Sequence, residues 1–471
     1  MRHDRRGLQG AAALLVVALC ACGARSTGGG GGGGDGGPDV FADTPVGKDG
    51  PTSTDQPVAP DTPVTTDVPS TCAPTQNADL LFVVDNSNSM AQNQAYFARH
   101  FDAILNSLTA PTVGSAINSL HIGVISTDLG TPGSVVPSCA NSDQGDDGVL
   151  NPIRNGRAIA MHQPWTTAPP GYRPSMCMND PNQFPNFLTF DAMTTNAAMF
   201  RDQFVCNAYL STGGCGLEQQ IESAYRALIV HNPRAVPGNT DPNAGFVRDN
   251  AVLGILFVTD EEDGSVRDCR YAESGVSCTD AVTVFDIMSR DWASADLNLR
   301  FYMYVPGSRQ DPTWSLDRYM DPTRLTRGFL SLKPGRPQLV VMGAITGVPL
   351  DLPMRGDRVD WDTLLGTLPD GSNGYTRMSA EGPVSMRQRN MDPTCSTRVV
   401  PACRREGSTQ TGFCDPASQY FAWPSRRVAQ LVRRFDERFN NGLITSICRN
   451  DYSGMLTAFA DKLRARATCA P

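Results

Sequence analysis

Apolar runs in the body of the chain end abruptly at acidic residues. Residues 80–84 are all apolar and are followed directly by Asp85, and a second, mostly apolar run over residues 252–258 ends two positions before Asp260. Uninterrupted apolar runs predict strands that are covered on both faces, as in the centre of a parallel sheet. Ligands of such sheets bind beyond the carboxyl ends of the strands. We therefore expect Asp85 and Asp260 at the binding edge of the sheet.

Strands and helices alternate along the rest of the body. Helices are predicted where apolar residues recur every three or four positions, and strands where short apolar runs lie between turns. The predicted helices cover residues 92–108, 200–207, 217–229, 281–292, 428–439 and 452–467. The remaining predicted strands cover residues 121–126, 299–305, 338–344 and 443–448. This alternation predicts an α/β fold with a mostly parallel central sheet and helices on both faces.

Two long segments interrupt this alternation. Residues 129–195 are dense in proline, glycine, asparagine and aspartate, and residues 347–418 carry three cysteines. Irregular segments of this length are usually functional or disordered. We expect both to be loop-rich, disulfide-bearing insertions in one enlarged domain over residues 72–471.

The N-terminus has the pattern of an export signal. Arg2, Arg5 and Arg6 precede an apolar stretch over residues 11–19, which is too short to span a bilayer. The stretch ends in Ala21 and Cys22, which resembles the cleavage and acylation site of bacterial lipoproteins. The resemblance implies that residues 1–21 are a lipoprotein signal peptide, that Cys22 is lipidated, and that the outer membrane of a Gram-negative bacterium holds the protein. An ordinary secreted protein is the alternative.

The segment over residues 22–71 lacks the apolar content of a core. It consists mainly of glycine, proline, aspartate, threonine, serine and valine, with seven consecutive glycines over residues 28–34. Such a composition predicts a disordered tether between the lipidated cysteine and the domain. The net charge of −8 over 471 residues argues against a nucleic-acid partner, and the membrane is expected to be reached through the lipid alone.

Cysteine usage fits an exported protein. Of the 14 cysteines, Cys20 leaves with the signal peptide and Cys22 carries lipid, which leaves an even number for disulfides. Sequence proximity suggests three pairs, and a fourth would clasp the ends of the domain. These pairs are Cys206 with Cys215, Cys269 with Cys278, Cys139 with Cys177, and Cys72 with Cys469. The remaining candidates are Cys395, Cys403, Cys414 and Cys448.

The loop after the first apolar run carries a recognisable metal-binding pattern. Asp85, Ser87 and Ser89 form an Asp-x-Ser-x-Ser motif, and Asp260 follows the second buried run. Together these loops resemble the metal-ion-dependent adhesion site of von Willebrand factor A (VWA) domains, which have a Rossmann-like α/β fold. The resemblance implies a site for Mg²⁺, or for Mn²⁺ or Ca²⁺, with Asp85, Ser87, Ser89, Thr212 and Asp260 as ligands.

Thr212 departs from the family pattern, because its spacing to the following helix is longer than in the family and Cys215 intervenes. A turn or helix-entry residue is the alternative for Thr212, and a helix cap is the alternative for Asp85. If this middle loop, residues 211–218, supplies no ligand, metal affinity would fall and the domain would serve as a metal-free interaction module.

Three other charged groups have simpler interpretations. Asp143, Asp146 and Asp147 hint at a calcium loop, but a polar turn is favoured. Glu261, Glu262 and Asp263 could hold a second cation, but a solvated acidic rim is favoured. A solvated helix face is favoured over a basic docking surface for Arg426, Arg427, Arg433, Arg434 and Arg438.

Binding fits these features better than catalysis. The chain has no His-Glu-x-x-His, Gly-x-Ser-x-Gly or phosphate-binding Gly-x-x-x-x-Gly-Lys motif, so we do not expect an enzyme. The resemblance implies a membrane-anchored, metal-dependent adhesion or protein-binding module whose partner completes the metal coordination with an acidic residue. A structural or motility-associated envelope component without metal is the alternative, and a hydrolase is a distant third.

Overall fold

The computed structural model describes residues 74–110, 117–131, 145–151, 185–210, 212–231, 241–267, 301, 311–320, 327–365, 402–407 and 421–468. The chain divides into two units, residues 1–68 and 69–471, and all described residues belong to the second. The predicted signal peptide, Cys22 and the tether lie outside the described residues. So does the predicted helix over residues 281–292, whereas the predicted strand over residues 299–305 is described only at Phe301, which is helical.

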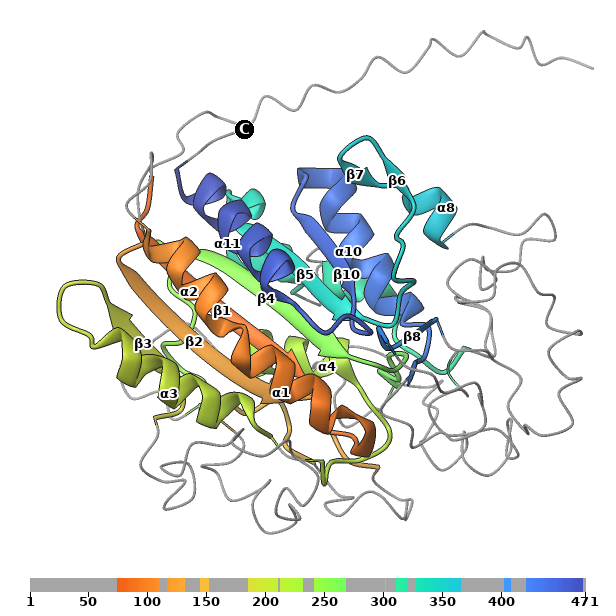
Figure 1. The fold of residues 1–471 in the computed structure, drawn as a ribbon. Coiled ribbons are helices and arrows are strands. Elements are labelled where there is room, and N and C mark those ends of the chain that lie inside the picture. The colour runs from red at the N-terminus through yellow and green to blue at the C-terminus, as the bar shows by residue number, and fades with distance from the viewer. Residues whose placement is uncertain are drawn as a thin grey trace, which may run out of the picture. The chain divides into compact units, whose positions relative to one another are not determined.

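A six-stranded, mostly parallel sheet forms the centre of the domain (Figure 1). Its strand order is β10-β5-β4-β1-β2-β3, and only β3 runs antiparallel to its neighbour. The strands are β1 (Asn77–Val84), β2 (Ser119–Ser126), β3 (Leu188–Asp191), β4 (Val252–Thr259), β5 (Val340–Thr346) and β10 (Gly442–Ser446). The predicted α/β class with a mostly parallel sheet is therefore confirmed.

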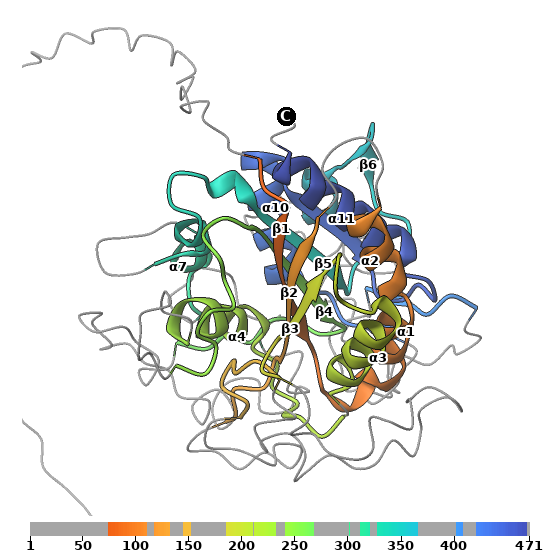
Figure 2. The same ribbon diagram turned by 90° about the vertical axis from the view of Figure 1, so that its left-hand side faces the viewer.

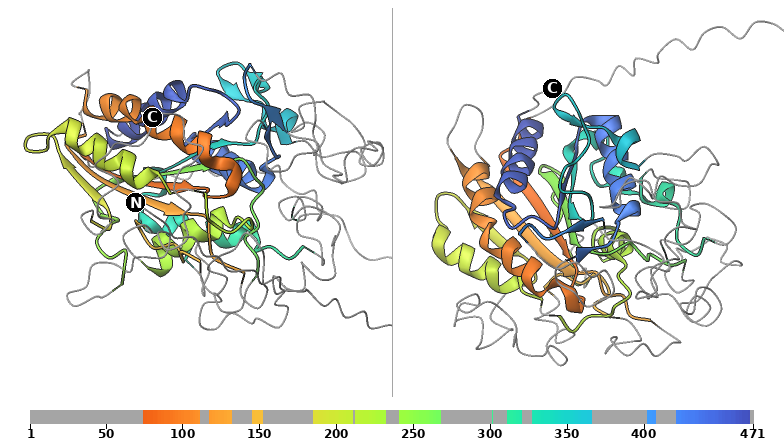
Figure 3. Two further views of the ribbon diagram at one scale, coloured as in Figure 1. Left: turned by 60° about the horizontal axis from the view of Figure 1, so that its bottom comes forward. Right: turned by 45° about the vertical axis from the view of Figure 1, so that its right-hand side comes forward.

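Helices cover both faces of the sheet. Successive residues of a strand point to opposite sides, and in the central strands both sets are apolar, so each face needs a covering layer. Leu80 and Phe82 of β1 belong to one buried apolar cluster, and Leu81 and Val83 belong to the other. On the first face lie α1 (Ala91–Arg99), α2 (Phe101–Thr109), α3 (Ala197–Ala208) and α11 (Ser453–Ala467). On the second lie α4 (Gln220–Tyr225), the π-helix Arg226–Val230, α7 (Leu316–Met320) and α10 (Arg426–Phe439). Figures 2 and 3 show the two layers from other sides.

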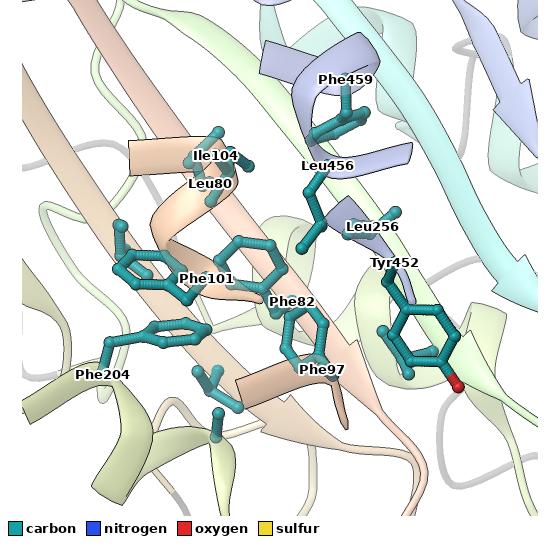
Figure 4. Close-up of a cluster of buried hydrophobic side chains, with 14 of the residues drawn as sticks. Leu80, Phe82, Phe97, Phe101, Ile104, Phe204, Leu256, Tyr452, Leu456 and Phe459 are labelled. Carbon is teal, nitrogen blue, oxygen red and sulfur yellow. The ribbon is translucent and has the colours of Figure 1, made fainter. Parts of the chain in front are cut away.

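Aromatic rings fill the core beneath α1, α2 and α3 (Figure 4). The Phe82 ring on β1 meets the rings of Phe97 and Phe204 edge to face, with centroids 5.2 and 5.3 Å away. Phe101 stacks on Phe204 with centroids 3.6 Å apart. Because aromatic pairs contribute beyond their buried area, this group ties three helices to the central strand.

The two ends of the described domain meet at the amino end of β1. The backbone N–H of Thr75 donates to the carbonyl oxygen of Ala467 at 2.9 Å, which joins the entry to β1 to the end of α11. Arg248 Nε donates to the buried carboxylate of Asp79 at 2.7 Å on the same side of the sheet. This edge is therefore closed by protein contacts, which leaves the opposite, carboxyl edge for a site.

Several elements differ in detail from the sequence prediction. The helix expected over residues 92–108 is two helices that meet at His100, and the helix expected from residue 217 begins at Gln220. The strand expected from residue 338 begins at Val340, after a short 3₁₀ turn. The predicted insertions contain unpredicted elements: β3, β6 (Met354–Arg355), β7 (Arg358–Val359), α8 (Trp361–Leu365) and β8 (Cys403–Arg404). These elements are too short to produce a clear periodic pattern.

One disulfide joins two described residues, and it differs from the suggested pairs. Cys403 in β8 is bonded to Cys448, two residues after β10, so the second insertion is fastened to the sheet. Cys206 and Cys215 are each disulfide-bonded. Among the described residues, however, these two cysteines are not bonded to each other. The other eight candidates lie outside the described residues: Cys72, Cys139, Cys177, Cys269, Cys278, Cys395, Cys414 and Cys469.

Within the part of the chain that the structure describes, no helix is long and apolar enough to cross a bilayer.

Candidate metal centre

Three polar loops meet at the carboxyl edge of the sheet. They follow β1, β2 and β4, and β1 lies between the other two strands. The N–H of Asp85 donates to the carbonyl oxygen of Val258 at 2.9 Å, which keeps the first and third loops together beyond the ends of their strands. The chain leaves β1 toward β2, whereas β4 lies on the other side, so the loops meet where the strand order reverses.

Four of the five predicted ligands form a continuous chain of contacts. Asp85 Oδ1 accepts from the Ser87 N–H at 2.8 Å, and the Ser87 and Ser89 hydroxyl oxygens lie 3.2 Å apart. The Ser89 hydroxyl donates to Asp260 Oδ1 at 3.1 Å. Thr259 Oγ1 also donates to Asp85 Oδ2 at 2.7 Å. The Asp-x-Ser-x-Ser motif is thus linked by successive contacts that end at Asp260.

Thr212 is not connected to this chain of contacts. It is half-buried, and within the described part of the protein it makes no hydrogen bond with Asp85, Ser87, Ser89 or Asp260. The loop that carries Thr212 lies between α3 and α4, and it approaches the site through its backbone instead. Gly214 N–H donates to the carbonyl oxygen of Asn86 at 3.0 Å, and Cys215 N–H donates to Asp128 Oδ2 at 3.1 Å. Thr212 therefore stays a sequence prediction, and the side chain that enters the site lies further along the loop.

Glu218 is that side chain. One oxygen each from Asp85, Glu218 and Glu261 lie within 4.8 Å of one another, and all three residues are buried. Glu218 Oε2 accepts from the Thr127 hydroxyl, while Oε1 is buried without a hydrogen-bond partner. Its backbone oxygen accepts from the Gly264 N–H at 2.7 Å, which fixes it against the loop after β4. Three converging carboxylates are a suitable ligand set for a hard divalent cation.

The electrostatics of the site favour a cation. Burial raises the pKa of Glu218 well above its usual range, and the nearby charges of Asp85, Asp128 and Asp260 raise it further. Burial and Asp85 likewise raise the pKa of Asp260. Burial also raises the pKa of Asp85 and of Asp128. Buried like charges disfavour ionisation, and a bound divalent cation would reverse that preference.

The solvated acidic rim expected at Glu261, Glu262 and Asp263 is wrong, because all three residues are buried. Glu262 and Asp263 pack against the start of α10, where Glu262 Oε1 accepts from the Arg427 N–H at 2.8 Å and Asp263 Oδ2 accepts from Arg427 Nε at 2.8 Å. Glu262 Oε2 also accepts from the Arg426 N–H at 3.2 Å. The expectation of a solvated helix face is therefore wrong for Arg426 and Arg427, which are buried among acids.

The expected polar turn after residue 144 is present. Asp146 Oδ2 accepts from the Ser126 hydroxyl at 2.6 Å, and Asp147 Oδ1 accepts from Arg226 Nε at 2.7 Å. Gly145 has a φ of 55° and lies against the backbone of residues 128 and 130, so a side chain there would be strained. Asp143 lies outside the described residues.

Gly214 is expected to control the geometry of the metal centre. A Cβ atom at Gly214 would lie 2.2 Å from Asn86 Oδ1, and Asn86 stands between Asp85 and Ser87. Gly214→Ala must therefore displace the buried side chain of Asn86 in the first loop, and we expect affinity for Mn²⁺ to fall about tenfold, as for loss of an outer-shell contact. Isothermal titration calorimetry measures this affinity. Gly454→Ala is the control, because a Cβ there meets nothing within 4 Å. Equal affinity of the two variants would contradict a positioning role for Gly214.

No protein-family model, curated protein or solved structure matches the chain. The assignment of the site therefore rests on the residues and their geometry.

Proposed function

We propose that the protein is a lipid-anchored, VWA-type binding module of the bacterial cell envelope that recognises a protein partner through a divalent cation. The observation that carries this proposal is the convergence of Asp85, Glu218 and Glu261 beside the Ser87–Ser89–Asp260 contacts. The doubly covered, mostly parallel sheet supports it, since the site lies where such sheets bind ligands. The lipoprotein-like sequence around Cys22 supports the anchor.

Carboxylate and hydroxyl oxygens select the class of metal. Mg²⁺, Mn²⁺ and Ca²⁺ all bind oxygen ligands, but Ca²⁺ accepts six to eight of them in irregular geometry, whereas Mg²⁺ requires near-octahedral order and keeps several waters. In this proposal Asp85, Glu218 and Glu261 hold the cation, and Ser87 and Ser89 orient the first loop or contribute hydroxyl oxygens. The cation neutralises the buried acids and offers a remaining position to the partner.

Cation binding is tested on the full-length chain in detergent, freed of metal with a chelator. Calorimetric titration with MgCl₂, MnCl₂ and CaCl₂ should show one saturable cation per protein. Asp85→Ala combined with Ser87→Ala should abolish the binding, because both residues lie at the centre of the contacts. Unaltered binding by the double variant would place the cation elsewhere and overturn the proposal.

The partner is proposed to contribute an acidic residue to the cation. The three carboxylates of the centre already exceed the charge of one divalent ion, so this part of the proposal needs a direct test. The probe is N-acetyl-aspartic acid amide, with its asparagine analogue as the matched control, added to Mn²⁺-loaded protein. A coordinating carboxylate displaces metal-bound water and lowers the water-proton relaxation rate. Equal effects of the two compounds would contradict an acidic partner residue.

A further inference from the structure

Arg405 is a buried positive charge beside the acidic cluster. It follows β8 (Cys403–Arg404) in the second insertion, and only 7% of its surface is exposed. The Cys403–Cys448 disulfide, two residues before it, fastens this segment to the end of β10. On the other side of Arg405, the Glu406 N–H donates to the Cys448 carbonyl oxygen at 2.9 Å. The guanidinium is therefore held from both sides.

Asn93 connects Arg405 to Asp260. Arg405 Nη2 donates to Asn93 Oδ1, and Asn93 Nδ2 lies 3.4 Å from Asp260 Oδ2, in position to donate. Because a guanidinium carries only donors, it requires the amide oxygen of Asn93 to face it, and the amide nitrogen then faces Asp260. The other oxygen of Asp260 accepts from Ser89 at 3.1 Å. Both carboxylate oxygens of Asp260 are thus engaged by protein donors.

Arg405 faces Asp260 through the single amide of Asn93, and its guanidinium is buried, so its charge is little screened by water. The guanidinium also lies 5.2 Å from the centroid of the Tyr96 ring, which favours the charged group at this buried position. On the side of Asp260, the acidic cluster therefore already has a positive charge from the protein, the guanidinium of Arg405.

We propose that Arg405 is a positioning residue that serves as the permanent counter-cation of Asp260 and confines the divalent cation to the side of Asp85, Glu218 and Glu261. The location of the metal rests on the proposed function, whereas the pairing of Arg405 with Asp260 does not. Repulsion between the guanidinium and the metal lowers the affinity of the site below that of the carboxylates alone. The disulfide maintains this effect because it holds Arg405 in place.

The test compares Arg405→Gln with Arg405→Lys in the full-length chain. Arg405→Gln removes the positive charge, and we expect its affinity for Mn²⁺ to rise about tenfold by calorimetry, whereas Arg405→Lys stays near wild type. The double variant Cys403→Ser with Cys448→Ser should raise the affinity in the same direction, and it should add nothing in the Arg405→Gln background. Arg434→Gln, which removes a surface arginine paired with Asp317, is the control.

A merely structural role for Arg405 gives a different result. If its contacts only maintain the fold, Arg405→Gln and Arg405→Lys would both weaken cation binding or leave it unchanged, and the proposal would be overturned. An unchanged affinity in the double cysteine variant would overturn the role of the disulfide.

A second measurement does not depend on the cation. In chelator, Arg405→Gln should lower the melting temperature more than Arg405→Lys does, because the buried Asp260 loses the positive charge that faces it through Asn93. If wild type bound no cation, the proposed function would fail while this difference still tested the pairing. Equal melting temperatures of the two variants would refute the counter-cation.

Discussion

Glu218→Gln is expected to lower the affinity for Mn²⁺ by more than about a hundredfold, beyond the 10–100-fold typical of outer-shell partners. Glu218 contributes one of the three converging carboxylates, and its Oε1 is buried without a hydrogen-bond partner. The amide keeps the size of the side chain but removes the negative charge that a cation would neutralise. Calorimetry on metal-free, full-length protein measures the change.

Thr212→Val is the matched control for this prediction. Thr212 is the ligand that the family resemblance implies in the middle loop, yet it makes no hydrogen bond with the four neighbouring site residues among those described. We expect its affinity to equal that of wild type. The opposite result, a loss in Thr212→Val with Glu218→Gln unaffected, would restore the ligand set implied by the family.

Glu218→Gln should weaken cation binding but stabilise the metal-free protein. Burial and neighbouring acids raise the pKa of Glu218, so its charged form destabilises the folded state above the pKa of the unfolded chain. Glu218→Gln removes that charge. In chelator at neutral pH, the variant should therefore melt at a higher temperature than wild type. With saturating Mn²⁺ the order of the two melting temperatures should reverse.

Phe82→Ala is expected to reduce the free energy of unfolding by about 3–5 kcal/mol, as for large-to-small substitution in a well-packed core. The Phe82 side chain is fully buried on the central strand and meets the rings of Phe97, Phe101 and Phe204. Loss of the ring leaves a cavity between β1 and the helices α1, α2 and α3, which pack against it. Urea denaturation monitored by circular dichroism, at a fixed Mn²⁺ concentration, measures the effect.

Met193→Ala provides the comparison for Phe82→Ala. Met193 is 90% exposed, so its truncation should change the free energy of unfolding by less than about 0.5 kcal/mol. Similar losses in the two variants would mean that the aromatic group contributes no more than an exposed side chain.

The sequence predicted the central sheet well because burial on both faces has a direct signature. The apolar runs that precede Asp85 and Asp260 correspond to β1 and β4, and every residue of β4 is buried. The edge strand β3 was not predicted, because it has four residues with alternating burial inside a polar segment. A short strand of this kind is formed by pairing with β2 more than by its own pattern.

The site was predicted in part for a similar reason. Asp85 and Asp260 follow neighbouring parallel strands, so their proximity follows from the fold. Glu218 approaches from a loop whose path depends on tertiary contacts with Thr127 and Gly264. A signal was nevertheless present, because Glu218 is the one charged residue between positions 211 and 221. A lone carboxylate that immediately precedes a buried helix is a reasonable candidate ligand.

Pairing between distant residues explains the wrong expectation for the helical arginines. Arg427 is buried because it meets Asp263, which lies 164 residues away along the chain. Helical periodicity places Arg427 outside the apolar stripe, but it carries no information on what packs against that face. Only the fold reveals that an acidic loop occupies the position.

The placement of the chain ends has a mechanical consequence. The chain enters the described domain at the amino end of β1, where Thr75 meets Ala467, whereas the metal centre lies at the other end of the same strand. Tension between a tether and a partner bound at the metal centre would thus run along β1. That strand pairs in parallel with β2 and β4 over nearly its whole length. Such a pull loads these hydrogen bonds in shear, so many of them must break together before β1 leaves the sheet.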